Sequence, residues 1–279
     1  MIIWLASYPK SGNTLLRAII SSILFTDDGI FQPNIIDKIK KFPTQENFEN
    51  FTKNFNDFNE TIKYSIMAQD FINLNNEINF LKTHHLNCKI NNFNFTNLEN
   101  TLATIYIVRD PRNVVTSVSN HFSKTIQEAK EFLFTQKFIG GSNKLGLEIN
   151  NDVKTLIGTW SEHYNFWKNS RNLFLIRFED LIYDPKTEIK KIIVFLNNFL
   201  DIQVNETKLD NICKTTSFEN FQKIEKNGLF KENAYQNPNI KKKFFNLGPN
   251  NKWQNLIEKK VSDEIEKKFF KEMTELKYI

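Results

Sequence analysis

The chain opens on a short apolar run that leads through a turn-forming segment into a helix. Residues 2–6 read Ile-Ile-Trp-Leu-Ala, and residues 7–12 read Ser-Tyr-Pro-Lys-Ser-Gly, with both proline and glycine. This pattern predicts a buried parallel strand followed by a tight loop. Residues 13–25 then predict a helix that Asn13 could cap. Strand, tight loop and helix in this order are the opening unit of nucleotide-binding α/β folds, so the chain is expected to belong to that class.

Further along, strand patterns continue to alternate with helix patterns. The later predicted strands are residues 78–83, 104–108 and 173–178, and the predicted helices are 112–123, 152–168 and one that has Pro185 in its first turn. This alternation predicts a three-layer α/β/α fold with a central, mainly parallel sheet and a P-loop-like nucleotide-binding architecture. The length of 279 residues allows one large α/β domain or two small domains, and we expect one elaborated domain over 1–279.

Three stretches depart from the alternation and are expected to be variable segments or additions. In residues 27–76, Phe48, Phe51, Phe55 and Phe58 have helical spacing, which favours core packing over an acceptor-binding wall. Residues 124–150 contain Gly140-Gly141-Ser142 and predict a loop or lid, and residues 256–277 predict a charged amphipathic helix.

Composition narrows the classes of function and compartment. The net charge of +5 fits an anionic ligand without naming one. Two cysteines argue against a disulfide scaffold and favour a reducing compartment, and no cysteine–histidine spacing indicates a zinc site. No apolar run is long enough to span a membrane, and no basic stripe with interleaved aromatic residues suggests nucleic acid. We therefore expect a cytoplasmic protein with no transmembrane segment and no nucleic-acid partner.

The loop after the first predicted strand favours an anion. Its backbone N–H groups and the following helix dipole point at one spot, where Lys10 adds a positive charge and Gly12 allows close approach. The lysine precedes the glycine, unlike in a Walker A loop, and no acidic residue after a strand offers an obvious magnesium ligand. A metal-free phosphate or sulfate loop fits better than an NTPase loop, and an ordinary strand–helix turn is the alternative.

At this point the sequence resembles a known family. Y-P-K-S-G-N-T at residues 8–14 resembles the 5′-phosphosulfate loop of sulfotransferases that use 3′-phosphoadenosine 5′-phosphosulfate (PAPS). Four further matches follow in the family's order: L-K-T-H at 81–84, R-D-P-R-N-V-V-T-S at 109–117, F-E-D-L at 178–181 and T-T-S-F at 215–218. The matches reach from residue 7 to at least 218, and their style is closer to bacterial members than to animal cytosolic ones.

The resemblance implies a role for each matching residue. His84 would be the general base, Lys10 would stabilise the leaving phosphate, and Lys82 would contact the sulfuryl oxygens. The implied donor-binding residues are Lys10, Ser11, Gly12, Asn13, Thr14, Arg109, Ser117, Thr216, Ser217, Phe218 and Gly248. No metal is implied. Alternation along a strand places Lys82 and His84 on one side and turns His85 away.

Several residues keep a plainer interpretation beside the functional one. His84 could simply hydrogen-bond at a strand end, and Arg109 could pair with Asp110 or Glu179. Other expectations are structural: Arg112 as helix-end charge, Trp4 as core, and His121 and His163 as helix residues rather than ligands.

The sequence also departs from the family pattern at two places. Asn246-Leu247 stand where many members have Arg-Lys before the glycine at 248, and Phe178 stands where many have tyrosine. Lys241, Lys242 and Lys243 could replace the missing pair, or they could form a solvated basic turn.

The resemblance implies an enzyme that moves a sulfuryl group from PAPS to a hydroxyl or amine. Its expected acceptor is a small molecule, a lipid or a glycoconjugate. The alternatives are a non-catalytic nucleotide-binding protein on the same scaffold and, less favoured, a P-loop kinase.

Overall fold

A computed structural model describes residues 1–141, 153–230 and 243–279 of the chain. Tertiary contacts divide the chain into two compact units. Unit 1 comprises Met1–Pro9, Lys40–Val108 and Phe132–Leu175, and unit 2 comprises Lys10–Ile39, Arg109–Glu131 and Ile176–Ile279. Each unit is therefore built from segments that are distant in the sequence.

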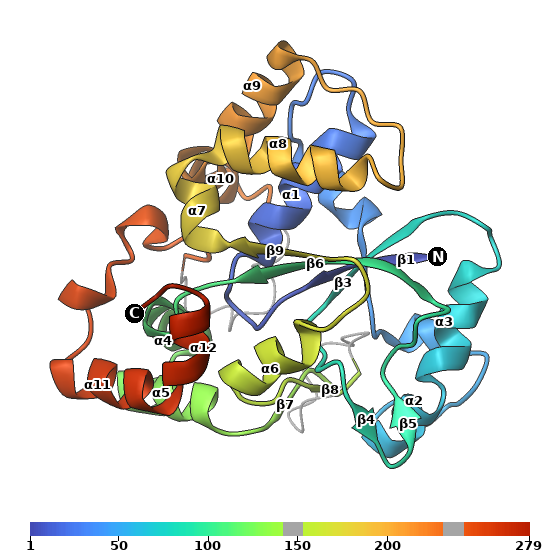
Figure 1. The fold of residues 1–279 in the computed structure, drawn as a ribbon, viewed down its shortest axis with the longest axis horizontal. Coiled ribbons are helices and arrows are strands. Elements are labelled where there is room, and N and C mark those ends of the chain that lie inside the picture. The colour runs from blue at the N-terminus through green and yellow to red at the C-terminus, as the bar shows by residue number, and fades with distance from the viewer. Residues whose placement is uncertain (142–152, 231–242) are drawn as a thin grey trace. The chain divides into compact units, whose positions relative to one another are not determined.

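Unit 1 is organised around a five-stranded sheet with the order β2-β3-β1-β6-β9 (Figure 1). Its strands are β1 (Ile2–Ala6), β2 (Lys40–Lys41), β3 (Asn79–Thr83), β6 (Thr101–Val108) and β9 (Leu173–Arg177), whose last two residues fall in unit 2. β1 pairs in parallel with β3 and β6, and β2 pairs in parallel with β3. The predicted mainly parallel sheet is confirmed, although the sequence did not reveal the two-residue strand β2.

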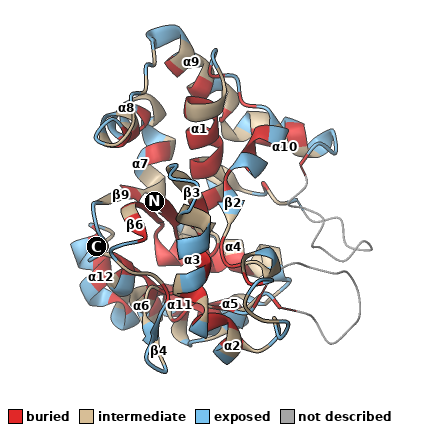
Figure 2. Cartoon of the chain, turned by 90° about the vertical axis from the view of Figure 1, so that its right-hand side faces the viewer, coloured by how far each residue is buried: buried red, intermediate tan, exposed pale blue. Residues whose placement is uncertain are grey.

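The core of unit 1 is centred on the first strand, as its apolar sequence predicts. All five residues of β1 are buried, as are all residues but one of the neighbouring strand β6, which is mostly red in Figure 2. The Trp4 ring lies 5.4 Å from Phe95, 5.7 Å from Phe42 and 6.2 Å from Trp167, measured between centroids. Its indole N–H donates to Thr101 Oγ1. Trp4 is thus a core residue, as expected.

The remaining elements of unit 1 lie around this sheet. They are η2 (Gln45–Asn47), α2 (Phe58–Lys63), α3 (Ser65–Asn73), β4 (Lys89–Ile90), β5 (Phe93–Asn94), β7 (Phe138–Ile139), β8 (Thr155–Leu156) and α6 (Trp160–Trp167).

Two helix predictions in unit 1 are wrong because polar capping residues start the helices later. No single helix carries Phe48 to Phe58: α2 begins only at Phe58, where the Asp57 side chain accepts the Asn59 N–H. Phe48 and Phe58 are buried, in agreement with core packing. The helix expected from residue 152 begins at Trp160, because Thr159 and Glu162 form a capping box.

Unit 2 is mostly helical. Its elements are α1 (Asn13–Phe25), η1 (Pro33–Lys38), α4 (Pro111–Phe122), α5 (Ile126–Phe134, whose last three residues fall in unit 1), α7 (Phe178–Tyr183), α8 (Pro185–Leu196), α9 (Glu206–Thr215), α10 (Phe218–Lys226), η4 (Gly248–Asn250), η5 (Trp253–Asn255), α11 (Lys259–Lys268) and α12 (Phe270–Glu275). α1 has the predicted bounds, and Pro185 opens α8 as expected.

Some expectations for the segments of unit 2 need correction. Residues 256–277 form two helices, α11 and α12, rather than one, with the break at Phe269. The segment expected to be a loop or lid contains α5, and Gly140 and Gly141 follow β7, while Ser142 lies outside the described residues.

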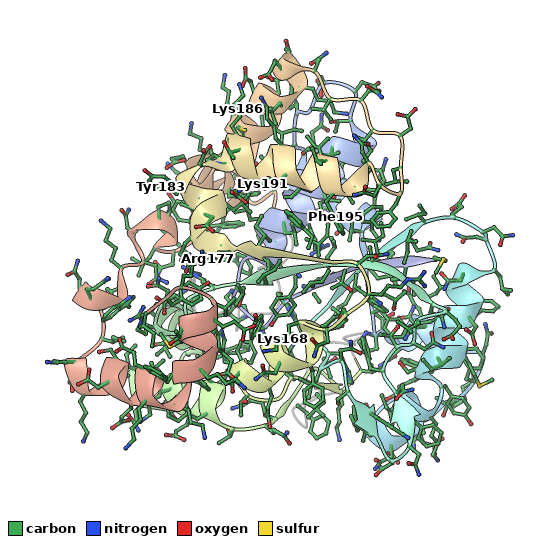
Figure 3. The ribbon with its side chains drawn as sticks, in the orientation of Figure 1. Lys168, Arg177, Tyr183, Lys186, Lys191 and Phe195 are labelled. Carbon is green, nitrogen blue, oxygen red and sulfur yellow. The ribbon has the colours of Figure 1, made fainter. Side chains whose placement is uncertain are left out.

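The surface of α8 carries ion pairs to α9. Lys186 Nζ lies 3.0 Å from Glu206 and 2.6 Å from Asp210, and Lys191 pairs with Glu188 on its own helix. Figure 3 shows Lys186 and Lys191 on α8. Solvent screens such exposed pairs, so they contribute little to the stability of unit 2. None of the helices in the part of the chain that the structure describes is long and apolar enough to cross a membrane.

Candidate active site

The sheet of unit 1 brings Ser7 and His84 together. Ala6 and Thr83 are partners in the parallel β1–β3 pairing, so the residues that follow them leave the sheet side by side. His84 Nδ1 lies 2.7 Å from the Ser7 carbonyl oxygen and 3.2 Å from Ser7 Oγ. Because a carbonyl oxygen can only accept, Nδ1 carries the proton. Nε2 is therefore the basic nitrogen of His84.

His84 is held in its neutral form. Burial lowers its pKa well below 6.5, and the positive charge of Lys82 lowers it further. Lys41 contributes to the same effect, because it is the register partner of Lys82 across the β2–β3 pair. A neutral imidazole at pH 7 can accept a proton, as a general base must.

The adjacent histidine has a different environment. The His85 ring stacks on Phe95 at 4.3 Å and on Phe58 at 5.9 Å between centroids. Its Nδ1 donates to the Leu86 carbonyl oxygen, and burial lowers its pKa to about 4. His85 is thus a residue of the aromatic core, which agrees with the expectation that it turns away from His84.

In unit 2, the residues before α1 form a tight turn. Lys10 and Gly12 both have positive φ, 68° and 104°, which is the left-handed region. The Gly12 carbonyl accepts the Leu16 N–H and so starts α1. Asn13 already lies inside the helix, so the expectation that it caps α1 is wrong. The helix N-terminus and Lys10 favour negative charge here.

Arg109 lies beside this loop within unit 2. Its Nη1 donates to the Lys10 carbonyl oxygen at 3.3 Å, and its guanidinium carbon lies 4.3 Å from the centroid of the Phe178 ring. Burial lowers its pKa, Glu179 opposes that effect, and the group stays cationic. The hydrogen bond joins two of the segments that the sequence assigned to phosphate binding.

Two buried hydrogen-bond donors in this region have no acceptor among the residues that the structure describes. They are Ser11 Oγ and Arg109 Nε. A buried donor that lacks a partner costs about 1–3 kcal/mol. An anion that accepts from both atoms would remove this cost.

The alternative interpretation of Arg109 was an ion pair with Asp110 or Glu179, but in the structure both carboxylates have other partners. Glu179 accepts the Asp110 backbone N–H and the Tyr278 hydroxyl, each at 3.0 Å. Asp110 pairs with Arg112 at 2.7 Å. Within the described residues, Arg109 therefore forms no ion pair with either carboxylate.

Arg112 is a structural charge, as expected. It pairs with Asp110 and with Glu266 at 2.6 Å, donates to the Tyr278 carbonyl oxygen at 2.9 Å, and lies over the Trp253 ring. The sequence analysis named no partner for Arg112, and three of the four partners, Glu266, Tyr278 and Trp253, are more than 100 positions away.

The residues expected near adenine separate into two kinds. Thr216 Oγ1 donates to the Ile212 carbonyl oxygen, and Ser217 caps α10 by accepting the Asn220 N–H, so both side chains have local structural partners. Phe218 instead lies against Gly248: a Cβ added to that glycine would lie 2.3 Å from the ring. The structure thus joins two segments that the sequence singled out separately.

The other predicted residues are placed as follows. Thr14 is half-buried in α1 and Ser117 is half-buried in α4. Lys243 is exposed, and its carbonyl oxygen accepts from Asn120, while Lys241 and Lys242 lie outside the described residues. His121 is in α4 and His163 in α6, which confirms that both are helix residues.

Sequence reasoning missed two residues of these sites. Lys41 belongs to a strand too short to recognise from sequence. Phe244, whose ring centroid lies 4.0 Å from Lys10 Nζ, precedes the expected motif around Gly248 and has no motif of its own. Among the residues that the structure describes, no group of three or more His, Cys, Asp or Glu side chains could hold a metal ion.

Comparison with known protein families gives one match over nearly the entire chain. The family model described as "Sulfotransferase domain" matches residues 2–277. Among curated proteins, the chain is similar to sulfotransferase 1C2 of Homo sapiens, with 29% identity over 129 residues, 43% of this chain and 38% of that protein. It is also similar to flavonol 4′-sulfotransferase of Flaveria chlorifolia, with 22% identity over 285 residues, 95% of this chain and 77% of that protein.

Solved structures share the fold at low sequence identity. A mouse sulfotransferase complexed with PAP matches with a TM-score of 0.58 and 21% identity, covering 97% of this chain and 83% of that one. Retinol dehydratase in complex with androsterone and inactive cofactor PAP matches with a TM-score of 0.63 and 17% identity, covering 98% and 80%. The expected fold class, a mainly parallel sheet flanked by helices, is confirmed.

Proposed function

The chain belongs to the sulfotransferase family, and we propose that it transfers a sulfuryl group from PAPS to a hydroxyl or amine of a small acceptor. The alignment with the human relative spans 38% of that protein's length, so the activity is argued from this chain's own residues. We also propose that residues 1–279 act as one sulfotransferase domain in the cytoplasm. In support of a single domain, neither compact unit is a continuous stretch of chain.

The observation that carries this proposal is the contact between Arg109 and the Lys10 loop. The hydrogen bond from Arg109 to the Lys10 carbonyl oxygen joins two segments that each suit a phosphate. Ser11 Oγ and Arg109 Nε are buried and have no partner among the described residues, so both are available to donate. A ligand with two separate phosphate groups, as PAPS has, could accept hydrogen bonds from both of these groups.

The remaining donor-binding roles follow the family motifs. Gly12, Asn13 and Thr14 would hold the 5′-phosphate with backbone and hydroxyl donors, and Ser117 would hold the 3′-phosphate with Arg109. Phe218, backed by Gly248, would contact the adenine. Thr216 and Ser217 would shape this segment through their local hydrogen bonds rather than through side-chain contact with the nucleotide.

The transfer step is an in-line displacement at sulfur. The acceptor oxygen or nitrogen forms a bond to sulfur while the bond from sulfur to the 5′-phosphate oxygen breaks, and 3′-phosphoadenosine 5′-phosphate (PAP) leaves with the electron pair. His84 Nε2 takes the acceptor proton, which is typically worth about 10²–10⁴-fold in rate. Lys10 would neutralise the leaving phosphate, and Lys82 would stabilise charge on the sulfuryl oxygens.

The acceptor is proposed only as a class. Similar curated proteins include an amine sulfotransferase of Oryctolagus cuniculus and flavonol sulfotransferases of Flaveria. A small molecule, a lipid or a glycoconjugate with a nucleophilic hydroxyl or amine is therefore the proposed acceptor. Phe51 and Phe55 are half-buried, unlike Phe48 and Phe58, and we propose them as an apolar wall of the acceptor site.

Calorimetry and transfer assays test the proposal in sequence. PAP should bind equally well with and without a metal chelator; binding of ATP–magnesium without binding of PAP would support the kinase alternative instead.

Radiolabelled PAPS is then offered with a phenol, a long-chain alcohol, an amine and a glycolipid. Label should appear on at least one acceptor, whereas PAP binding with no transfer to any would support the non-catalytic alternative. A His84→Ala variant should bind PAP normally and lose turnover.

A further inference from the structure

We propose that His163, on α6, is a positioning residue that fixes the orientation of the general base His84. This inference rests on the proposed function, because it gives His84 the role of base. Its geometry lies entirely within unit 1.

The first two carbonyl groups after β3 are held by side chains of α6, while the Leu86 N–H donates to the Leu156 carbonyl oxygen on β8. β3 ends at Thr83, so the carbonyl groups that follow lie beyond the sheet ladder. His163 Nε2 lies 3.1 Å from the His84 carbonyl oxygen, and Trp167 Nε1 donates to the His85 carbonyl oxygen at 2.9 Å. Residues 163 and 167 are one helical turn apart, so one face of α6 fixes two successive carbonyl groups.

The direction of the His163 hydrogen bonds follows from its partners. A carbonyl oxygen only accepts, so His163 Nε2 carries a proton. Burial lowers the pKa of His163 to about 3, and the ring is therefore neutral at pH 7. Nδ1 must then be an acceptor, and the Tyr106 hydroxyl, 2.8 Å away, donates to it. Tyr106, on β6, thereby selects the tautomer that lets His163 hold His84.

His84 is consequently anchored at two points. Its backbone carbonyl accepts from His163, and its ring Nδ1 donates to the Ser7 carbonyl oxygen at 2.7 Å. With both fixed, only Nε2 remains to accept a proton, and its direction is set by the two anchors. A catalytic group displaced by about 1 Å can cost on the order of 100-fold in rate. The loss of the His163 N–H should therefore act on the chemical step.

Two variants of His163 separate positioning from packing. His163→Met fills the buried site but removes the donor, while His163→Gln keeps an N–H at a similar reach. We expect His163→Met to lower kcat by roughly 10- to 100-fold with an unchanged KM for PAPS, and His163→Gln to recover most of that loss. PAP affinity should be the same in both variants. Equal losses in the two variants, or kcat unchanged in His163→Met, would overturn the proposal.

A double variant and a spectroscopic readout complete the test. In a His84→Ala background, His163→Met should add no further loss of kcat, and a full additional loss would indicate a structural role instead. Nitrogen-15 shifts of the His84 ring should report a protonated Nδ1 in wild type and a mixture of tautomers in His163→Met. An unchanged tautomer in that variant would count against positioning. This readout needs no turnover, so it still decides the point if the wild-type protein transfers no sulfuryl group.

Discussion

The guanidinium carbon of Arg109 lies 4.3 Å from the centroid of the Phe178 ring. Phe178 stands where the family resemblance led us to expect tyrosine, and it opens α7 directly after β9. An aromatic face attracts a guanidinium and holds its plane, while the N–H edges remain available to a phosphate. The departure from tyrosine therefore removes a hydroxyl but keeps the support for Arg109.

The first prediction concerns what Arg109 binds. Replacing it with lysine keeps the charge but loses the planar fork, so Arg109→Lys should weaken PAP binding by about 10- to 150-fold, the equivalent of roughly 1.5–3 kcal/mol. Calorimetry measures this. Adenosine 5′-phosphate, which lacks the 3′-phosphate, serves as the control ligand and should lose little affinity. Equal losses for both ligands would assign Arg109 to the other phosphate or to folding.

The second prediction concerns the pH dependence of turnover. Burial and Lys82 hold the pKa of His84 well below 6.5, and Lys41 adds to this effect. The rate should therefore be constant near pH 7 and fall only as pH drops toward that lowered pKa. Lys41→Met removes one repulsive charge, so the pKa of His84 should rise and the acidic fall in kcat/KM should move to higher pH.

Lys40→Met is the matched control for this experiment. Lys40 is exposed and is the strand neighbour of Lys41, but it is not among the groups that shift the pKa of His84. Its replacement makes the same change in net charge and should leave the pH profile in place. If both variants moved the profile equally, the effect would come from the overall charge rather than from Lys41.

The sequence predicted the central sheet and the short motifs because their signals are local. The apolar run at residues 2–6 and the turn before Gly12 each occupy one stretch of chain, and both appear where expected. Helix starts set by single caps were harder to place. Thr159 with Glu162 moves the start of α6 to Trp160, and an apolar pattern does not reveal such a cap.

Contacts between distant segments were not predictable from a single sequence. The support of His84 by His163, and of Lys10 by Phe244, depends on how helices and loops pack rather than on local spacing. His163 looked like an ordinary helix residue, since its polar partners lie 57 and 79 positions away. The identity of such residues requires the tertiary structure.

The third prediction concerns stability in acid. Burial lowers the pKa of His85 to about 4, below its ordinary value of 6.5. The unfolded chain therefore takes up this proton at a higher pH than the folded chain does. The contribution of neutral His85 to the free energy of unfolding is fully present above about pH 6.5 and decreases as pH falls toward 4. Each such group contributes up to about 1.4 kcal/mol per pH unit in that window.

His85→Phe removes this group while keeping a ring between Phe58 and Phe95. The free energy of unfolding, from denaturant titrations between pH 6 and 4.5, should then decline less steeply by about 1.4 kcal/mol per pH unit. Only the slopes are compared, so a difference in absolute stability between the two proteins does not affect the result. An identical slope would show that His85 titrates normally in the folded protein.

The fourth prediction concerns the buried ion pair of Arg112. Its guanidinium pairs with Asp110 and Glu266, and its side chain is 7% exposed. Removing one partner of a buried pair leaves an uncompensated charge, so Arg112→Met should lower the free energy of unfolding by about 3–5 kcal/mol. Lys186→Met, which breaks exposed pairs on α8, should change the free energy of unfolding much less, because solvent screens exposed charges. Comparable losses from both would contradict the structural role assigned to Arg112.

The last prediction compares two glycines that share a backbone conformation but differ in surroundings. Gly248 has φ 51° and Gly228 has φ 71°, so alanine costs roughly 1–2 kcal/mol of strain at either position. A Cβ at Gly248 would lie 2.3 Å from the Phe218 ring, whereas a Cβ at Gly228 meets nothing within 4 Å. Gly248→Ala must therefore displace Phe218. If Phe218 contacts the adenine, Gly248→Ala should weaken PAP binding roughly tenfold, and Gly228→Ala should leave it unchanged. Calorimetry on both variants decides this, and equal PAP affinities would remove Phe218 from the nucleotide site.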